Sequence, residues 1–161
     1  MSAARWAEAF FAGAPYRWGG ITTWGVDCSG LVQAAYRVRG IRLPRDSAQQ
    51  AEVGEPVQAT AEQNDFAVGD LLFFGETGER SGVRGDARRR RLGGDSAPDR
   101  ITHVAIADGA GYVVHASAAA GSVCRSPLTG GSAEAAWLRG TFAGARRVER
   151  PPAGGPAGRS G

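Results

Sequence analysis

VDCSGLVQAAYRVRG, residues 26–40, is the stretch that decides the fold. Its apolar side chains recur at helical spacing, at Leu31, Ala34, Ala35 and Val38. Gly40 can end such a run, so the pattern predicts a helix that begins beside Cys28. Unpaired amides and the helix dipole favour negative charge at that end, so we expect them to lower the pKa of the Cys28 thiol and to leave backbone NH groups for an oxyanion.

Two further helices are expected in the first third of the chain. Ala3, Trp6, Ala7 and Phe10 would form one face of a helix that ends before Gly13 and Pro15. A short helix should open at Asp46 or Ser47, both good N-caps, and run towards Gly54.

Strands dominate the second half of the chain. Short β-rich runs cover residues 71–74, 101–107 and 112–116, and residues 140–148 form a last strand candidate. We interpret residues 76–100, rich in Arg and Gly, as an insertion loop, and residues 151–161 as a disordered tail. Helices followed by an antiparallel meander predict a single α+β domain over residues 1–150, with N-terminal helices packed on an antiparallel sheet.

Composition excludes several classes of function. All nineteen basic residues are Arg, and sixteen acidic residues leave a net charge of only +3, so we expect no nucleic-acid partner. No apolar run approaches the roughly 20 residues that cross a bilayer, and no secretion signal is visible at the N-terminus. We expect a monomer without a transmembrane segment.

His103 and His115 are the only histidines, and both lie in β-rich runs joined by a turn around Gly109 and Ala110. An odd-numbered loop would bring the two imidazoles to one face, where one can orient the other by a hydrogen bond. A two-residue loop would instead pair His103 with Ala116. Each histidine alone would by default be a satisfied core residue.

Metal and cofactor sites are not expected. The chain has two cysteines but no C-x-x-C or H-x-x-x-H spacing, and Cys28 is far in sequence from the histidines. Cys124, without a helix beside it, is interpreted as an unreactive strand residue, and a bridge between the two cysteines is discounted because it would remove the nucleophile.

Six blocks of sequence resemble the NlpC/P60 family in order and spacing. They lie within residues 4–125 and read PYRWGG (15–20), VDCSGLV (26–32), LPR (43–45), VGDLLFF (68–74), THVAI (102–106) and VHAS (114–117). Any one block would be weak support, but six in one order form a strong joint signal.

The resemblance implies a papain-like fold and a cysteine endopeptidase that cuts peptidoglycan stem peptides or muropeptides, typically between γ-D-glutamate and a diamino acid. It assigns Cys28 as nucleophile, His103 as general base, His115 as the residue that orients the base, and Tyr16 as an aid to oxyanion binding. Such substrates suggest the cell envelope, although recycling of soluble fragments inside the cell is also open.

Alternatives remain for several residues. Asp27 and Ser29 flank the nucleophile and are candidate substrate contacts, although Asp27 is equally a helix N-cap. Trp18 is a third candidate contact, and for Trp18 and Trp24 we expect the core or the wall of a groove rather than catalysis. Residues 88–91, four consecutive Arg, either lie on a solvated loop or meet anionic wall polymer.

Two other functions use the same residues differently. A related thiol amidase or acyltransferase would form the same acyl-enzyme but yield other products. A cell-wall-binding module would keep the fold without catalysis.

Overall fold

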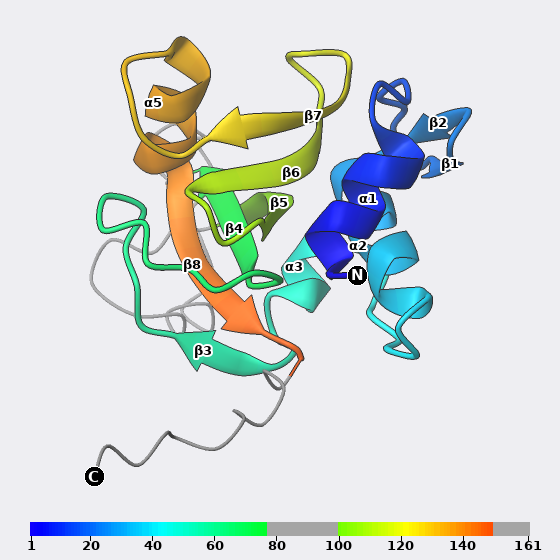
Figure 1. Cartoon of the computed structure of the whole chain (residues 1–161), viewed down its shortest axis with the longest axis horizontal. Helices are drawn as coiled ribbons and strands as arrows, with labels where there is room; N and C mark the ends of the chain where they lie inside the picture. The colour runs from blue at the N-terminus through cyan, green and yellow to red at the C-terminus, as the bar shows by residue number, and fades with distance from the viewer. Residues whose placement is uncertain (77–99, 150–161) are drawn as a thin grey trace, which may run out of the picture.

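The computed structural model describes residues 1–76 and 100–149 and has helices on both faces of one main sheet (Figure 1). The helices are α1 (Ala3–Phe11), α2 (Cys28–Arg37), α3 (Ser47–Gln50) and α5 (Ala133–Thr141). The expected α+β class, with N-terminal helices on an antiparallel sheet, is confirmed.

The main sheet has six antiparallel strands in the order β3-β8-β4-β5-β6-β7. Their bounds are β3 (Glu55–Val57), β4 (Leu71–Glu76), β5 (Arg100–Ala107), β6 (Tyr112–Ser117), β7 (Ser122–Pro127) and β8 (Phe142–Arg147). A two-stranded ribbon of β1 (Ile21–Thr22) and β2 (Gly25–Val26) stands directly before α2. β5 therefore lies inside the sheet, where its side chains are held on both sides by neighbouring strands.

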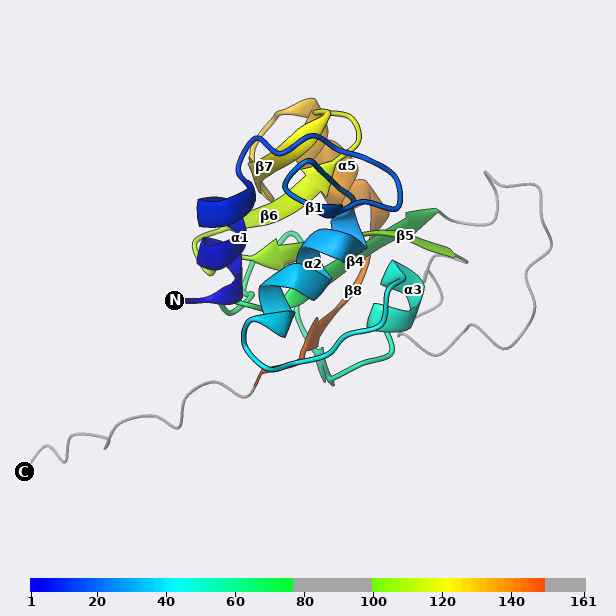
Figure 2. The same ribbon diagram turned by 90° about the vertical axis from the view of Figure 1, so that its right-hand side faces the viewer.

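Helices α1 and α2 cover one face of the sheet (Figure 2). Leu31 and Val32 of α2 are fully buried there, in one apolar cluster with Phe73, Val104 and Ile106 of the sheet. Burial of such side chains contributes about 1.5–3 kcal/mol each, so this contact fixes the position of α2 and of the cysteine at its start.

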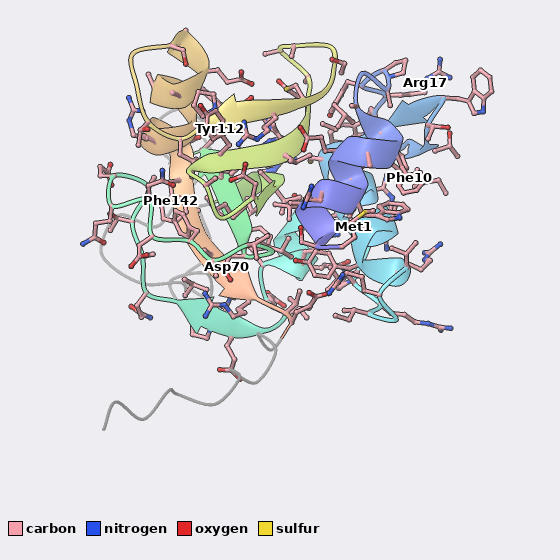
Figure 3. All side chains as sticks on the ribbon, viewed as in Figure 1. Met1, Phe10, Arg17, Asp70, Tyr112 and Phe142 are labelled. Atoms are coloured by element: carbon pink, nitrogen blue, oxygen red, sulfur yellow. The ribbon has the colours of Figure 1, made fainter. Side chains whose placement is uncertain are left out.

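The buried face of α1 differs from the expected one. Ala3, Ala4, Ala7 and Phe11 are buried, whereas Phe10, labelled in Figure 3, is 57% exposed and packs its ring on Trp6. Phe10 and Phe11 are adjacent and point to different faces of the helix, so either face could have been buried. The face with the small alanine side chains lets α1 lie closer to α2. The tertiary contact therefore selected Phe11 over Phe10.

The opposite face of the sheet is covered by α5, which the sequence analysis did not predict. Ser132 caps this helix by accepting a hydrogen bond from the Ala135 amide, and Leu138 is buried against Leu72, Phe74 and other residues of that face. The last strand begins only at Phe142 rather than at Gly140, because residues 140 and 141 complete α5.

Residues 77–99 and 150–161 lie outside the described residues. The expected insertion loop, its Arg run at 88–91 and the expected tail fall almost wholly in these ranges and stay predictions. Among the described residues, none belongs to a helix long and apolar enough to span a membrane.

Candidate active site

Cys28 is the first residue of α2, where the sequence predicted it. Asp27 caps the helix, since its Oδ1 atom accepts a hydrogen bond of 2.8 Å from the Gly30 amide. A Cβ atom at Gly30 would lie 2.3 Å from the Gly20 carbonyl oxygen, so only glycine fits this close approach to the loop before the ribbon. The helix start is thus fixed from two sides.

Arg45 completes this arrangement, although the sequence analysis gave it no role. Its guanidinium donates to both carboxylate oxygens of Asp27, at 2.9 and 2.7 Å, and to the Ser29 hydroxyl at 2.8 Å. Asp27 also accepts from the Gly19 amide. Burial by itself would raise the pKa of Asp27, but Arg45 and the amides of Gly30 and Gly19 hold it below its ordinary value.

These bonds use both oxygens of the Asp27 carboxylate within the protein. They favour the interpretation of Asp27 as the N-cap, in which Arg45 braces the turn that carries the cysteine. Both Asp27 and Ser29 are buried. A direct contact of either residue with substrate stays a prediction.

The Cys28 side chain is only 8% exposed and lies against the strand that carries His103. Val104, directly after His103 in the chain, lies in the same buried cluster as Cys28, and its amide lowers the pKa of the thiol. The pKa of Cys28 is raised, chiefly by burial and also by the charge of Asp27, and the amides of Val104, Ser29 and Cys28 lower it by less. The expected lowering of this pKa was therefore wrong, because burial outweighs the effect of the helix start.

His103 and His115 are in direct contact, with Nε2 of His103 2.8 Å from Nδ1 of His115. The loop between β5 and β6 has three residues, 109–111, because the Asp108 amide bonds to the Tyr112 carbonyl. The odd loop length that the sequence analysis required is thus present. Ile106 pairs with Val114. Three residues back on β5 and three residues forward on β6, Ser117 rather than His115 stands opposite His103. The two imidazoles meet diagonally on one face.

The second ring nitrogen of His115 faces two oxygen atoms. Nε2 lies 2.9 Å from Oγ of Ser126 and 3.3 Å from Oε1 of Glu134. Glu134 was missed because it lies on α5, and α5 itself was not predicted. Burial lowers the pKa of His115, and Glu134 partly opposes this; burial and the neighbouring His115 lower the pKa of His103 to about 3. Both rings are therefore uncharged at neutral pH.

A cavity of about 650 Å³ opens beside the histidine pair. His103, His115 and Tyr16 line it together with Glu134 and Trp137 of α5, and residues 117–120 close another side. The Trp137 ring stands edge-on to the His103 ring, with centroids 5.7 Å apart. Cys28 is not among the lining residues.

Tyr16 connects the cavity to the cysteine. Burial, then the charges of Cys28 and Asp27, raise the pKa of its phenol, so it stays protonated and can donate a hydrogen bond. The bridge of Tyr16 to Val26, two residues before Cys28, and the bond from its amide to Gly121 hold it between the ribbon and the β6–β7 turn.

Trp18 and Trp24 are not core residues. They are 84% and 87% exposed, on the loop and the ribbon before α2, and neither lines the cavity beside the histidines. Of the two expected places, core was therefore wrong, whereas the wall of a groove and a substrate contact through Trp18 stay predictions. Cys124 lies on β7 as expected, and both cysteines are free thiols.

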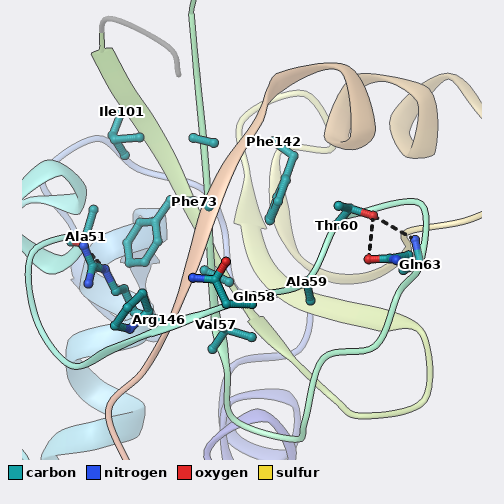
Figure 4. A pocket seen from close by; sticks show the side chains of 14 residues that line it. Ala51, Val57, Gln58, Ala59, Thr60, Gln63, Phe73, Ile101, Phe142 and Arg146 are labelled. Carbon is teal, nitrogen blue, oxygen red and sulfur yellow. Dashed lines mark hydrogen bonds between the residues drawn. The ribbon is translucent and has the colours of Figure 1, made fainter. Parts of the chain in front are cut away.

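A second cavity of similar volume lies between β8 and residues 56–63 (Figure 4). Phe73, Phe142 and Ile101 form its apolar wall, and Arg146 is its only titratable side chain. Its described lining includes no cysteine, histidine or carboxylate, unlike the lining of the cavity beside the histidine pair.

Comparisons with known proteins point to one family. The NlpC/P60 family profile matches residues 13–84. A γ-D-glutamyl-L-lysine dipeptidyl-peptidase of Bacillus cereus is 33% identical over 138 residues, which are 85% of this chain and 33% of that protein. The probable endopeptidase NlpC of Escherichia coli is 38% identical over 117 residues, 72% of this chain and 60% of that protein.

Solved structures agree with these relatives. A crystal structure of an NlpC/P60 family protein from Bacillus cereus superposes with a TM-score of 0.67 at 30% identity, over 91% of this chain and 39% of that one. The chain thus spans about a third to three fifths of the length of these proteins. The match of sequence profile, relatives and fold shows that the chain belongs to the NlpC/P60 family.

Proposed function

We propose that this chain is a cysteine endopeptidase that hydrolyses stem peptides of peptidoglycan, with Cys28 as nucleophile. One observation carries the proposal: two uncharged, hydrogen-bonded imidazoles line a cavity, and Val104, the neighbour of His103 on β5, is buried in one cluster with Cys28. A thiol, a base and a group that orients the base are what covalent catalysis by cysteine needs.

The proposed steps follow from the hydrogen-bond order. Nε2 of His103 is occupied by His115, so Nδ1 is the atom left to take the thiol proton. Because the pKa of Cys28 is raised, the resting pair is a neutral thiol and a neutral imidazole, and the proton moves as sulfur attacks the carbonyl carbon. His103 then gives this proton to the leaving amine, and an acyl-enzyme forms.

Hydrolysis of the acyl-enzyme reverses the roles. A water molecule loses a proton to His103 and attacks the acyl carbon, and the thiol leaves with that proton. The Tyr16 hydroxyl and the Cys28 amide at the start of α2 are the donors that we assign to the developing oxyanion. His115 positions His103, and its own Nε2–H donates to the oxygen atoms of Ser126 and Glu134.

The bond that we propose is the one between γ-D-glutamate and the diamino acid of the stem. The name of the Bacillus cereus relative, a γ-D-glutamyl-L-lysine dipeptidyl-peptidase at 33% identity, supports this choice. The chain covers 33% of that protein, so the specificity of this chain needs its own test.

Mass spectrometry of defined muropeptides is that test. Wild type should split the stem after γ-D-glutamate, and Cys28→Ala should release nothing. Cys28→Ser, which keeps size and polarity but is a weaker nucleophile, should fold alike by thermal unfolding and still lose nearly all activity. Release of an intact peptide from the sugar would indicate an amidase, and transfer to an added amine an acyltransferase. Hydrolysis by Cys28→Ala would overturn the proposal.

A further inference from the structure

His115, Cys124 and Glu134 form a second cluster of reactive groups behind the histidine pair. One ligand atom of each, an imidazole nitrogen, a sulfur and a carboxylate oxygen, lies within 4.8 Å of the other two. The residues come from β6, β7 and α5, where His115 stands opposite Cys124 in the strand register. Neither Cys124 nor its closeness to Glu134 has a part in the proposed peptidase chemistry.

We propose that these three side chains form an inhibitory binding site for Zn²⁺ or a similar thiophilic divalent cation. Imidazole, thiolate and carboxylate are the donors that zinc prefers. Zinc bonds of about 2.0 Å in a tetrahedron place nitrogen and oxygen ligands ~3.3 Å apart. The distance from Nε2 of His115 to Oε1 of Glu134 is already 3.3 Å.

The surroundings permit the remaining adjustment. Glu134 is 35% exposed in its side chain and lines the cavity, so it can move and a water molecule can reach the fourth position. Ser126, whose Oγ is 2.9 Å from Nε2 of His115 and 3.6 Å from Sγ of Cys124, would give up its contact with His115 to the ion. The Cys124 sulfur lies at most 4.8 Å from the other two ligand atoms. It then needs to move toward them by at most about 1.3 Å to become the third protein ligand.

Binding at this site would disable the base, an inference that rests on the proposed function. A neutral imidazole that holds a metal at Nε2 carries its only proton on Nδ1. Nδ1 of His115 would then donate to Nε2 of His103 across the 2.8 Å contact. His103 would in turn carry its own proton on Nδ1, the atom that must receive the proton of Cys28. The metal thus selects the wrong tautomer of the base without touching the nucleophile.

Cobalt titration of Cys28→Ala tests the site without any need for catalysis. The chain has only two cysteines, so in this variant a thiolate-to-cobalt absorption band can come only from Cys124. We expect one equivalent of Co²⁺ to produce the band and Zn²⁺ to displace it. In Cys28→Ala with Cys124→Ser the band should vanish and zinc binding should weaken at least ~10-fold, since the loss of a residue that only orients a metal ligand already costs that much. No band in Cys28→Ala, or equal zinc affinity in the two variants, would overturn the site.

Zinc inhibition of muropeptide hydrolysis tests the consequence. For wild type and for Cys124→Ser, the hydrolysis rate with zinc is divided by the rate of the same protein in chelator. Wild type should lose activity at zinc concentrations at least ~10-fold below those that inhibit Cys124→Ser, and chelator should restore it. Equal inhibition of both would place the inhibitory zinc elsewhere, for example on Cys28, and overturn this part. If wild type hydrolyses nothing, the proposed function fails while the cobalt result still decides the metal site.

Discussion

Nε2 of His103 and Nδ1 of His115 are 2.8 Å apart in a buried setting, so a single proton lies between the two rings. One ring must donate and the other must accept. The direction of this bond decides which nitrogen of His103 is free to act as a base. Any group that bonds to Nε2 of His115 therefore influences which nitrogen of His103 can act as the base in the proposed catalysis.

Replacement of His115 tests this positioning role. His115→Leu should lower kcat by roughly 10²-fold or more with little change in KM, because the base loses its orientation but the cavity stays. His115→Asn, whose side-chain oxygen can still accept from His103, should recover part of kcat. Steady-state kinetics in chelator measures both. Equal kcat values for the Leu and Asn variants would argue against orientation by a hydrogen bond.

The phenol of Tyr16 is tested by Tyr16→Phe. Loss of an oxyanion donor should reduce kcat by about 10²- to 10³-fold and leave thermal stability nearly unchanged. Tyr36→Phe is the matched control, since the buried Tyr36 hydroxyl donates to the Gly69 carbonyl away from the cavity. That variant should lose about 1 kcal/mol of stability and keep kcat. A loss of kcat in Tyr36→Phe, with kcat unchanged in Tyr16→Phe, would remove Tyr16 from the mechanism.

Acid should remove the contribution of Asp27 to stability. Its pKa in the folded protein is lowered, so the unfolded chain binds the proton more readily, and stability rises with pH across this window. The contribution is fully present above the unfolded value of about 3.8 and is lost as pH falls through the folded pKa. The difference in unfolding free energy between wild type and Asp27→Asn, measured by urea titration, should shrink below pH 4. A constant difference down to pH 2.5 would contradict the assignment.

Asp27 and Arg45 should be energetically coupled. A double-mutant cycle with alanine at both positions should give about 1–2 kcal/mol, because the Asp27 side chain is largely buried and the pair is bidentate. The exposed pair of Arg39 and Glu149 serves as a matched control and should give less than about 1 kcal/mol. Similar values for both cycles would mean that Arg45 is an ordinary surface partner rather than a brace.

Gly30→Ala should destabilise the start of α2. The new methyl group would meet the Gly20 carbonyl at 2.3 Å and the Asp27 carboxylate at 2.9 Å, so the backbone must shift, at a cost of about 1–3 kcal/mol. Gly140→Ala in α5 meets nothing within 4 Å and should stabilise by roughly 0.5–1 kcal/mol. Denaturant unfolding compares the two. A neutral Gly30→Ala would show that the loop before the ribbon can yield.

Local sequence patterns determined most of the fold. The apolar spacing of residues 31–38 and the cap at Asp27 placed the cysteine at a helix start, and short β-rich runs placed both histidines on adjacent strands. These signals are local, since a helix start and a strand face depend on residues a few positions apart. The six sequence blocks added the order of the site residues and the family.

Only the tertiary structure decided what surrounds those residues. It brought Arg45 to Asp27, and Cys124 and Glu134 to His115, across loops whose paths no local spacing rule fixes. It also set the protonation states, because burial outweighs the effect of the helix start on Cys28 and lowers the pKa of His103. The sequence determined which groups carry the chemistry; packing determined their charge, their hydrogen-bond order and their neighbours.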